Sequence, residues 1–132
     1  MTDEDIVTAV LEVIPATQAL YLFGSRARGC ERPDSDLDLG VLVPGRAGAA
    51  ELWDRAQELA VRFNLDVDLV DLRAASTVMQ HQVITSGRRL FAAPGQEVDR
   101  FEIFVLKEMT DLNEARAGVM ADIVREGRVH GR

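Results

Sequence analysis

The chain contains few cysteine, proline and aromatic residues, and these shortages exclude some classes of protein. Its one cysteine cannot form a disulfide within the chain, which excludes a small fold held together by disulfides. No apolar run approaches the roughly 20 residues that a membrane-spanning helix needs. The acidic start of the chain lacks the basic and apolar segments of a signal peptide. We therefore expect a cytoplasmic protein with no membrane contact.

Positive charge is also scarce, because 22 acidic residues against 15 basic ones give a net charge of −7. A broad nucleic-acid-binding surface is usually basic, so direct DNA binding is not expected. Arg26, Arg28 and Arg32 nevertheless lie close together in the chain. This local positive charge suits an anionic ligand such as a triphosphate; the alternative is that these arginines simply solvate a loop.

What the chain does have is a Gly-Ser pair followed, after ten residues, by two closely spaced aspartates. Gly24 and Ser25 come directly after an apolar run, and Asp36 and Asp38 flank Leu37. The backbone N–H groups and the hydroxyl of a Gly-Ser turn can bind phosphate. Because side chains alternate along a strand, the two aspartates point to one face, where they can share a divalent metal ion. This combination indicates chemistry on a nucleoside triphosphate.

Hydrophobic periodicity predicts one α/β domain in which helices follow short strands. Helices are expected at residues 3–13, 49–63, 74–85 and 96–127, the last with a possible break near Gly118. Strands are expected at residues 19–23, 37–43, 65–71 and 89–92. The Pro94–Gly95 pair is the clearest break in the chain. We therefore divide it into a core, residues 1–93, and a C-terminal helical extension, residues 94–132.

The third expected strand offers further carboxylates. Asp66 and Asp68 share one face of it, as Asp36 and Asp38 share one face of the second strand. If the two strands are neighbours, three or four carboxylates converge and raise one another's pKa values. Two Mg²⁺ ions would relieve this repulsion and create a site for phosphoryl or nucleotidyl transfer. The alternative is that Asp66 and Asp71 are solvent-facing strand residues, and this is the interpretation that we prefer for Asp71.

These motifs resemble those of the nucleotidyltransferases of the DNA polymerase beta superfamily. The matching segments are residues 23–25, 35–38 and 67–73, and the likeness covers nearly the whole chain. The chain is most similar to the minimal nucleotidyltransferases (MNT proteins) that are antitoxins to HEPN-domain toxins, in particular the MntA-type partners of HepT-type toxins. The resemblance implies an α/β (α+β) nucleotidyltransferase fold: a small mixed sheet flanked by helices, with a long C-terminal helix.

The resemblance also implies roles for individual residues. Asp36, Asp38 and Asp68 match the family's catalytic, metal-binding carboxylates, with Asp66 as a reserve candidate for the role of Asp68. They would hold two Mg²⁺ ions, with ATP as the substrate. Gly24 and Ser25 match the residues that hold the β- and γ-phosphates. The full set of nucleotide-binding candidates is Gly24, Ser25, Arg26, Arg28 and Ser35.

The function that the resemblance implies is that of an antitoxin in a type VII-like toxin–antitoxin pair. It would transfer AMP from ATP to a tyrosine hydroxyl of a cognate HEPN RNase toxin and so neutralise that toxin. Two alternatives stay open: an antitoxin that blocks the toxin by contact alone, and a nucleotidyltransferase acting on a small molecule or an RNA 3′ end. The apolar excess of the C-terminal helix makes it a candidate docking element, unless it packs across its own sheet.

Five other residues have ordinary structural interpretations. Trp53 and Phe63 are expected in the core, on the buried stripe of the second helix. Tyr21 is expected to be a core residue of the first strand rather than an acceptor for self-modification. His81 has no second His or Cys near it in the sequence with which to bind a metal ion. Cys30 is interpreted as incidental.

Overall fold

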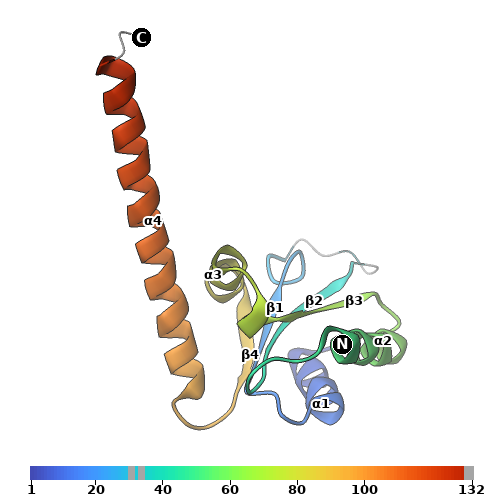
Figure 1. Cartoon of the computed structure of the whole chain (residues 1–132). Helices are drawn as coiled ribbons and strands as arrows, with labels where there is room; N and C mark the ends of the chain where they lie inside the picture. Colours follow the sequence, from blue (N-terminus) through green and yellow to red (C-terminus); the bar gives the residue numbers. More distant parts are fainter. Residues whose placement is uncertain (30–31, 33–34, 130–132) are drawn as a thin grey trace.

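The computed structural model describes residues 1–29, 32 and 35–129, so that Cys30 lies outside the described residues. Within them, helices cover both faces of one four-stranded sheet (Figure 1). The elements are α1 (Asp3–Val13), β1 (Ala19–Phe23), β2 (Leu37–Leu42), α2 (Ala49–Phe63), β3 (Val67–Asp71), the 3-10 turn η1 (Leu72–Ala74), α3 (Thr77–Ser86), β4 (Arg88–Ala92) and α4 (Glu97–Val129). This is the mixed α/β arrangement that the sequence predicts.

The strands lie in the order β3-β2-β1-β4. β1 is antiparallel to both of its neighbours, β2 and β4, whereas β2 and β3 are parallel and are joined by the crossover helix α2. Phe23 therefore pairs with Asp38, and Asp38 pairs with Asp68 on its other side. As a result, the end of β1 and the beginnings of β2 and β3 meet at one end of the sheet, which we call the carboxylate end.

Two hydrophobic cores form because side chains alternate between the faces of each strand. Leu20 and Leu22 of β1 pack in the core under α1 and α2, whereas Ala19 and Tyr21 pack in the core under α3 and α4. Tyr21 is 1% exposed, and its hydroxyl donates a hydrogen bond of 2.8 Å to Oε2 of Glu102 in α4. The prediction that Tyr21 is a core residue is confirmed.

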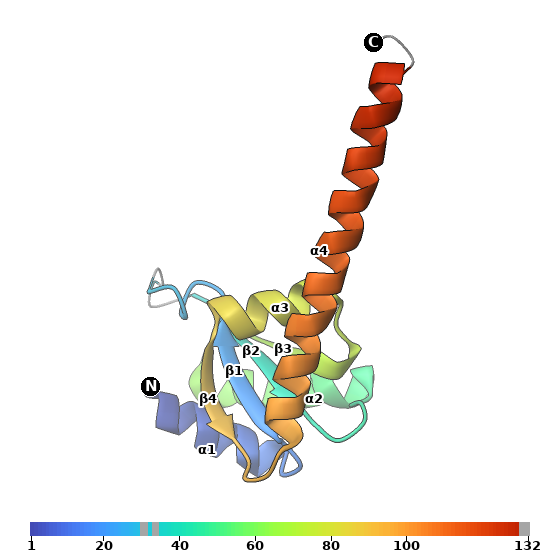
Figure 2. The ribbon, with the colours of Figure 1, turned by 90° about the vertical axis from the view of Figure 1, so that its left-hand side faces the viewer.

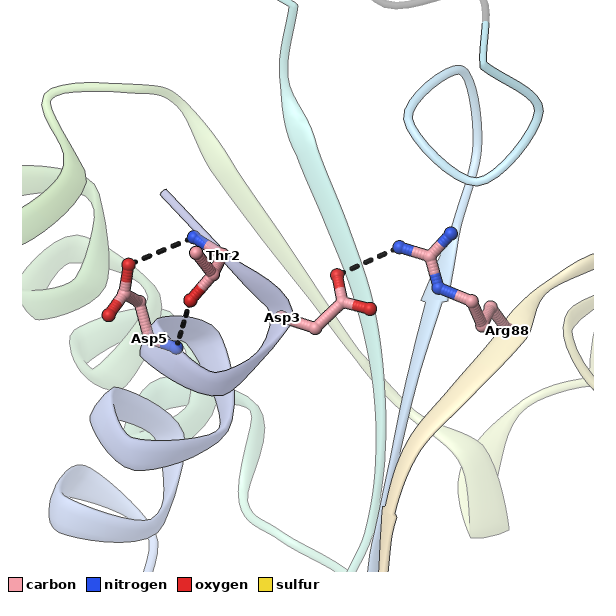
Figure 3. Close-up of polar contacts among 4 residues, drawn as sticks. All are labelled: Thr2, Asp3, Asp5 and Arg88. Atoms are coloured by element: carbon pink, nitrogen blue, oxygen red, sulfur yellow. Dashed lines mark hydrogen bonds and ion pairs between the residues drawn. The ribbon is translucent and has the colours of Figure 1, made fainter.

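The start of α1 is fixed by two local contacts (Figure 3). Thr2 and Asp5 form a capping box, in which the Asp5 N–H donates to the Thr2 hydroxyl and the Thr2 N–H donates to the Asp5 carboxylate. The bond from the Thr2 N–H to the carboxylate lowers the pKa of Asp5. Asp3 forms an ion pair of 2.8 Å with Arg88 of β4. The start of α1 is thus tied to β4, the edge strand on the opposite side of the sheet from β3.

Two expectations about the burial of individual side chains, Trp53 and Asp71, are wrong. Trp53 is 66% exposed, because the buried stripe of α2 runs through Leu52, Ala56 and Leu59, and the next residue along from Leu52 lies about 100° around the helix. Phe63, by contrast, is half-buried and packs against the first core, as predicted. Asp71 is not solvent-facing: it is 9% exposed and accepts hydrogen bonds from the N–H groups of Ala47 and Arg73, at 2.9 and 3.1 Å.

Element boundaries differ from the predictions where short polar residues compete for the backbone. The helix expected from residue 74 begins at Thr77, because Leu72–Ala74 form a 3-10 turn and Ser76 caps the helix by accepting a 3.1 Å bond from the Met79 N–H. The strand expected from residue 65 begins at Val67, which leaves Asp66 just before it.

The last helix, α4, has two different parts. Val98, Phe101 and Val105 in its first turns are buried in the second core. Beyond them α4 extends away from the sheet and from the other helices (Figures 1 and 2), and it runs without a break at Gly118. Its exposed large apolar residues are Ile103, Phe104, Leu106, Val119, Met120 and Ile123. The domain boundary between residues 93 and 94 stays a prediction. In the part of the chain that the structure describes, the helices are too short or too polar to cross a membrane.

Candidate active site

The turn that follows β1 packs directly against Asp38. Gly24 adopts a φ of +75°, a backbone conformation that side-chain-bearing residues rarely take. A Cβ atom added at Gly24 would lie 2.2 Å from Oδ2 of Asp38, well inside van der Waals contact. The position therefore requires glycine for two reasons, its φ and the closeness of the carboxylate. The sequence pair Gly24-Ser25 is thus physically joined to the aspartate pair that follows it.

The residues after Gly24 form a tight turn with unused donors. The N–H of Arg28 donates to the carbonyl oxygens of Gly24 and Ser25, at 3.3 and 3.2 Å. The N–H groups of Ser25, Arg26 and Ala27 have no acceptor among the described residues. Successive backbone N–H groups that are free at the start of a turn can bind an anion such as phosphate.

Asp38 lies among like charges. Leu37 and Leu39 on either side of it pack in the first core, so its side chain lies on the face of the sheet that carries α3. Burial raises the pKa of Asp38, the charges of Asp68 and Asp36 raise it further, and the charge of Arg28 partly offsets them. The predicted convergence of the second and third strands is therefore present. Asp66 is exposed and is not among the charges that act on Asp38.

This set of carboxylates suits a hard divalent cation. The raised pKa of Asp38 shows that its ionised form is disfavoured beside Asp36 and Asp68, and a cation would reverse that preference. Among the residues that the structure describes, no three His, Cys, Asp or Glu side chains already enclose a metal position. Mg²⁺ does not need such a cage, since proteins usually bind it through one or two carboxylates together with substrate phosphates. The donors therefore fit Mg²⁺ bound with a nucleotide.

The predicted arginines and Ser35 have different surroundings. Arg26 donates from Nε and Nη2 to the carbonyl oxygen of Ser35, at 3.2 and 2.8 Å, and so ties the turn after β1 to the segment before β2. The Ser35 hydroxyl accepts a 2.6 Å bond from the Arg32 N–H. Arg28 is the arginine whose charge acts on Asp38. The nucleotide-binding roles of these residues stay predictions.

A cavity of about 210 Å³ lies beside the turn. It is lined by Phe23, Gly24, Arg28, Met79, Gln82 and Ser86. The last three residues belong to α3, and sequence reasoning did not assign them to the site because they carry no motif and lie more than 50 residues away in the chain. The one available signal was the polar pair Gln82 and Ser86, which are four residues apart on one helical face.

The chain is similar to known nucleotidyltransferases. Residues 6–94 match the family model described as polymerase beta, nucleotidyltransferase. The chain is 34% identical over 124 residues to the protein adenylyltransferase MntA of Shewanella oneidensis, covering 94% of this chain and 88% of that protein. A crystal structure of a toxin–antitoxin with AMP-PNP includes a chain with a TM-score of 0.80 and 34% identity, covering 94% of this chain and 99% of that one. The tri-AMPylated S. oneidensis HEPN toxin in complex with MNT antitoxin gives 0.73 and 33%, covering 92% and 95%.

Proposed function

This chain belongs to the polymerase beta nucleotidyltransferase family, and from that premise we propose that it is the antitoxin of a type VII-like toxin–antitoxin pair and acts as a protein adenylyltransferase. It transfers AMP from ATP to a tyrosine hydroxyl of a cognate HEPN RNase toxin. The observation that carries this proposal is the packing of Gly24 against Asp38, which pairs with Asp68. That packing supports the proposal because it puts free backbone N–H groups beside Asp38, whose pKa is raised by burial and by the charges of Asp68 and Asp36.

The turn after β1 binds the distal phosphates of ATP. The free N–H groups of Ser25, Arg26 and Ala27, together with the Ser25 hydroxyl, donate to the phosphate oxygens. Arg26 holds this turn in place through its bonds to the Ser35 carbonyl oxygen. Arg28 adds positive charge beside the triphosphate. The donors are in position before ATP binds, so little reorganisation is needed during the reaction.

The carboxylates Asp36, Asp38 and Asp68 would hold two Mg²⁺ ions. When bound, these ions neutralise the triphosphate and make the α-phosphorus more electrophilic. Asp68, which is exposed and pairs with Asp38 from the neighbouring strand, accepts the proton of the incoming tyrosine hydroxyl. The tyrosine oxygen then forms a bond to the α-phosphorus, the bond to the β-phosphate bridging oxygen breaks, and pyrophosphate leaves. Because ATP is the donor, the reaction takes place in the cytoplasm.

The outer part of α4 is the docking surface for the toxin. We define this surface by its exposed apolar residues Val119, Met120 and Ile123, which belong to neither of the two hydrophobic cores. A shallow apolar cavity of about 350 Å³ lies beside them, lined by Ala115, Arg116, Val119 and Met120. An unpartnered apolar face of this kind marks an interaction site. The first turns of α4 instead belong to the core of the chain itself, so both interpretations of this helix hold, each for one part of it.

Label transfer from ATP tests the proposal. The cognate HEPN toxin is incubated with this chain, Mg²⁺ and ATP labelled on either the α- or the γ-phosphate. Label from the α-phosphate should appear on the toxin, and label from the γ-phosphate should be released as pyrophosphate. Label on the toxin from the γ-phosphate would instead indicate a kinase. Absence of any label on a toxin that is bound and silenced would favour the antitoxin that acts by contact alone.

A further inference from the structure

A second cleft, of about 490 Å³, lies at the other end of the sheet from the carboxylates. Asp38 is near the beginning of β2, whereas Arg46 of the cleft follows the end of that strand. Arg73 enters the cleft from η1, and Arg100, Phe101 and Phe104 enter it from the first turns of α4, whose position above the sheet is visible in Figure 2. The volume lies within the range of roughly 300–1,000 Å³ that is usual for small-molecule sites.

The cleft is positively charged in a chain that is otherwise acidic. Arg46, Arg73 and Arg100 line it together with Glu97, which leaves an excess of two positive charges among the described lining residues. The whole chain, by contrast, has a net charge of −7. A concave surface lined by one sign of charge concentrates ligands of the opposite sign. The ligand of this cleft is therefore expected to be an anion.

Arg73 is held in position in a way that suits recognition of a phosphate group. Its Nε donates to the Val43 carbonyl oxygen and its Nη2 donates to Oε1 of Gln18, both at 2.7 Å. Its guanidinium carbon lies 5.5 Å from the centre of the Phe101 ring. Three of its five N–H groups have no acceptor in the described part of the chain. A guanidinium fixed in this way keeps planar, forked donors that match phosphate geometry, with little entropy left to lose on binding.

The other two arginines are available to the same ligand. Arg46 is exposed and forms no hydrogen bond or ion pair with another described residue. Among the described residues, the Arg100 side chain bonds only to Oε1 of Gln96, the residue just before α4, at 2.8 Å. Beside them the ring of Phe104 is 55% exposed, although it lines a cleft rather than an open helix face. A bare phosphate or an acidic side chain would use the arginines but leave this ring uncovered.

We propose that this arginine cleft binds a nucleoside monophosphate, with the phosphate on Arg46, Arg73 and Arg100 and the base against Phe104. Aromatic rings are general platforms for nucleobases because every base has a π-face. The site is distinct from the carboxylate end and does not depend on transfer occurring there. Since α4 both lines the cleft and carries the apolar docking surface, the ligand contacts the helix that reaches the partner.

Binding is measured with a fluorescent analogue of AMP, on the full-length chain, in the presence of EDTA. Without divalent cations the carboxylate end repels a nucleotide, so the probe reports the arginine cleft. The double variant Arg46→Ala/Arg100→Ala should weaken binding about 100-fold, since each of the two charged hydrogen bonds contributes about tenfold. Phe104→Ala should weaken it by at least about fivefold through lost stacking.

A matched control removes the same charge elsewhere. Arg62 and Arg88 are exposed and form surface ion pairs with Glu12 and Asp3, away from the cleft. The Arg62→Ala/Arg88→Ala variant should leave the affinity unchanged. Equal weakening by this control, or full binding of the probe without Arg46 and Arg100, would overturn the proposal. Inorganic phosphate that binds as tightly as AMP would overturn the contact of the base with Phe104.

Discussion

Replacement of Gly24 by alanine tests whether the turn and Asp38, the carboxylate proposed to be catalytic, act as one unit. The substitution has two effects that the structure separates. A φ of +75° costs an alanine residue about 1 kcal/mol relative to glycine. In addition, the new Cβ would lie 2.2 Å from Oδ2 of Asp38 and 3.1 Å from its Cγ, so the carboxylate has to rotate away from the turn.

The expected result is a small loss of stability with a large loss of transfer. The clashing atoms are the far end of a half-buried side chain, which can rotate, so the melting temperature should fall by roughly 3–5 °C for each kcal/mol of strain. A carboxylate displaced by about 1 Å or more from its working position should lower the rate of AMP transfer about 100-fold. The rate is measured as label transferred to the toxin, beside thermal unfolding of the same variant.

Gly29 provides the matched control. It also has a positive φ, of +70°, but a Cβ added there would meet no atom of the described residues within 4 Å. Gly29→Ala should therefore show the same loss of stability with a nearly normal rate of transfer. If the two variants transfer AMP equally fast, the contact between the turn and Asp38 has no part in catalysis, and the reasoning about this site is refuted.

Three further predictions concern the carboxylates and α4. Asp68→Asn should abolish transfer, whereas Asp66→Asn should leave it nearly unchanged, because Asp66 does not act on Asp38. The two variants are compared by label transfer under identical conditions. Equal losses would contradict the assignment of the third carboxylate to Asp68 rather than Asp66. Asp38→Asn should raise the melting temperature at pH 7 in EDTA, because the raised pKa of Asp38 means that its ionised form destabilises the folded state. The gain should shrink as the pH falls through the acid range, where Asp38 becomes protonated and is as neutral as asparagine. A gain that grows on acidification would contradict this sign. Truncation after Leu112 should keep the fold, because Val98, Phe101 and Val105 remain, but should weaken toxin binding in a pull-down; full binding would exclude the outer part of α4 as the docking surface.

Local patterns in the sequence predicted most of the elements, because helical and strand periodicities come from which residues are buried. The helix at 3–13, the strand at 19–23 and the helix at 49–63 have the predicted bounds. The failures arise where a long-range contact decides. Asp71 looked solvent-facing, but it lies on the α2 side of β3, where the Ala47 N–H needs an acceptor. No local pattern in residues 71–74 predicts a hydrogen bond from the N–H of Ala47, which lies 24 residues away in the chain.

The candidate site divides in the same way. The Gly24-Ser25 turn and the aspartates stand close together in the chain, so their spacing alone predicted that they would meet. The approach of Asp68 depended on β2 and β3 being neighbours, which only the sheet topology supplies. The arginine cleft was beyond sequence reasoning, because Arg46, Arg73 and Arg100 come from three separate segments and are brought together by packing of α4.

The central claim, that this chain adenylylates a HEPN toxin through its three carboxylates, is tested most directly by the intact mass of the toxin. The cognate HEPN toxin is measured by mass spectrometry after incubation with the full chain, ATP and Mg²⁺. We predict mass added in AMP-sized steps, and no added mass when the Asp36→Asn/Asp38→Asn variant replaces the unaltered chain. A toxin that is bound and silenced at its original mass by both proteins would contradict the account.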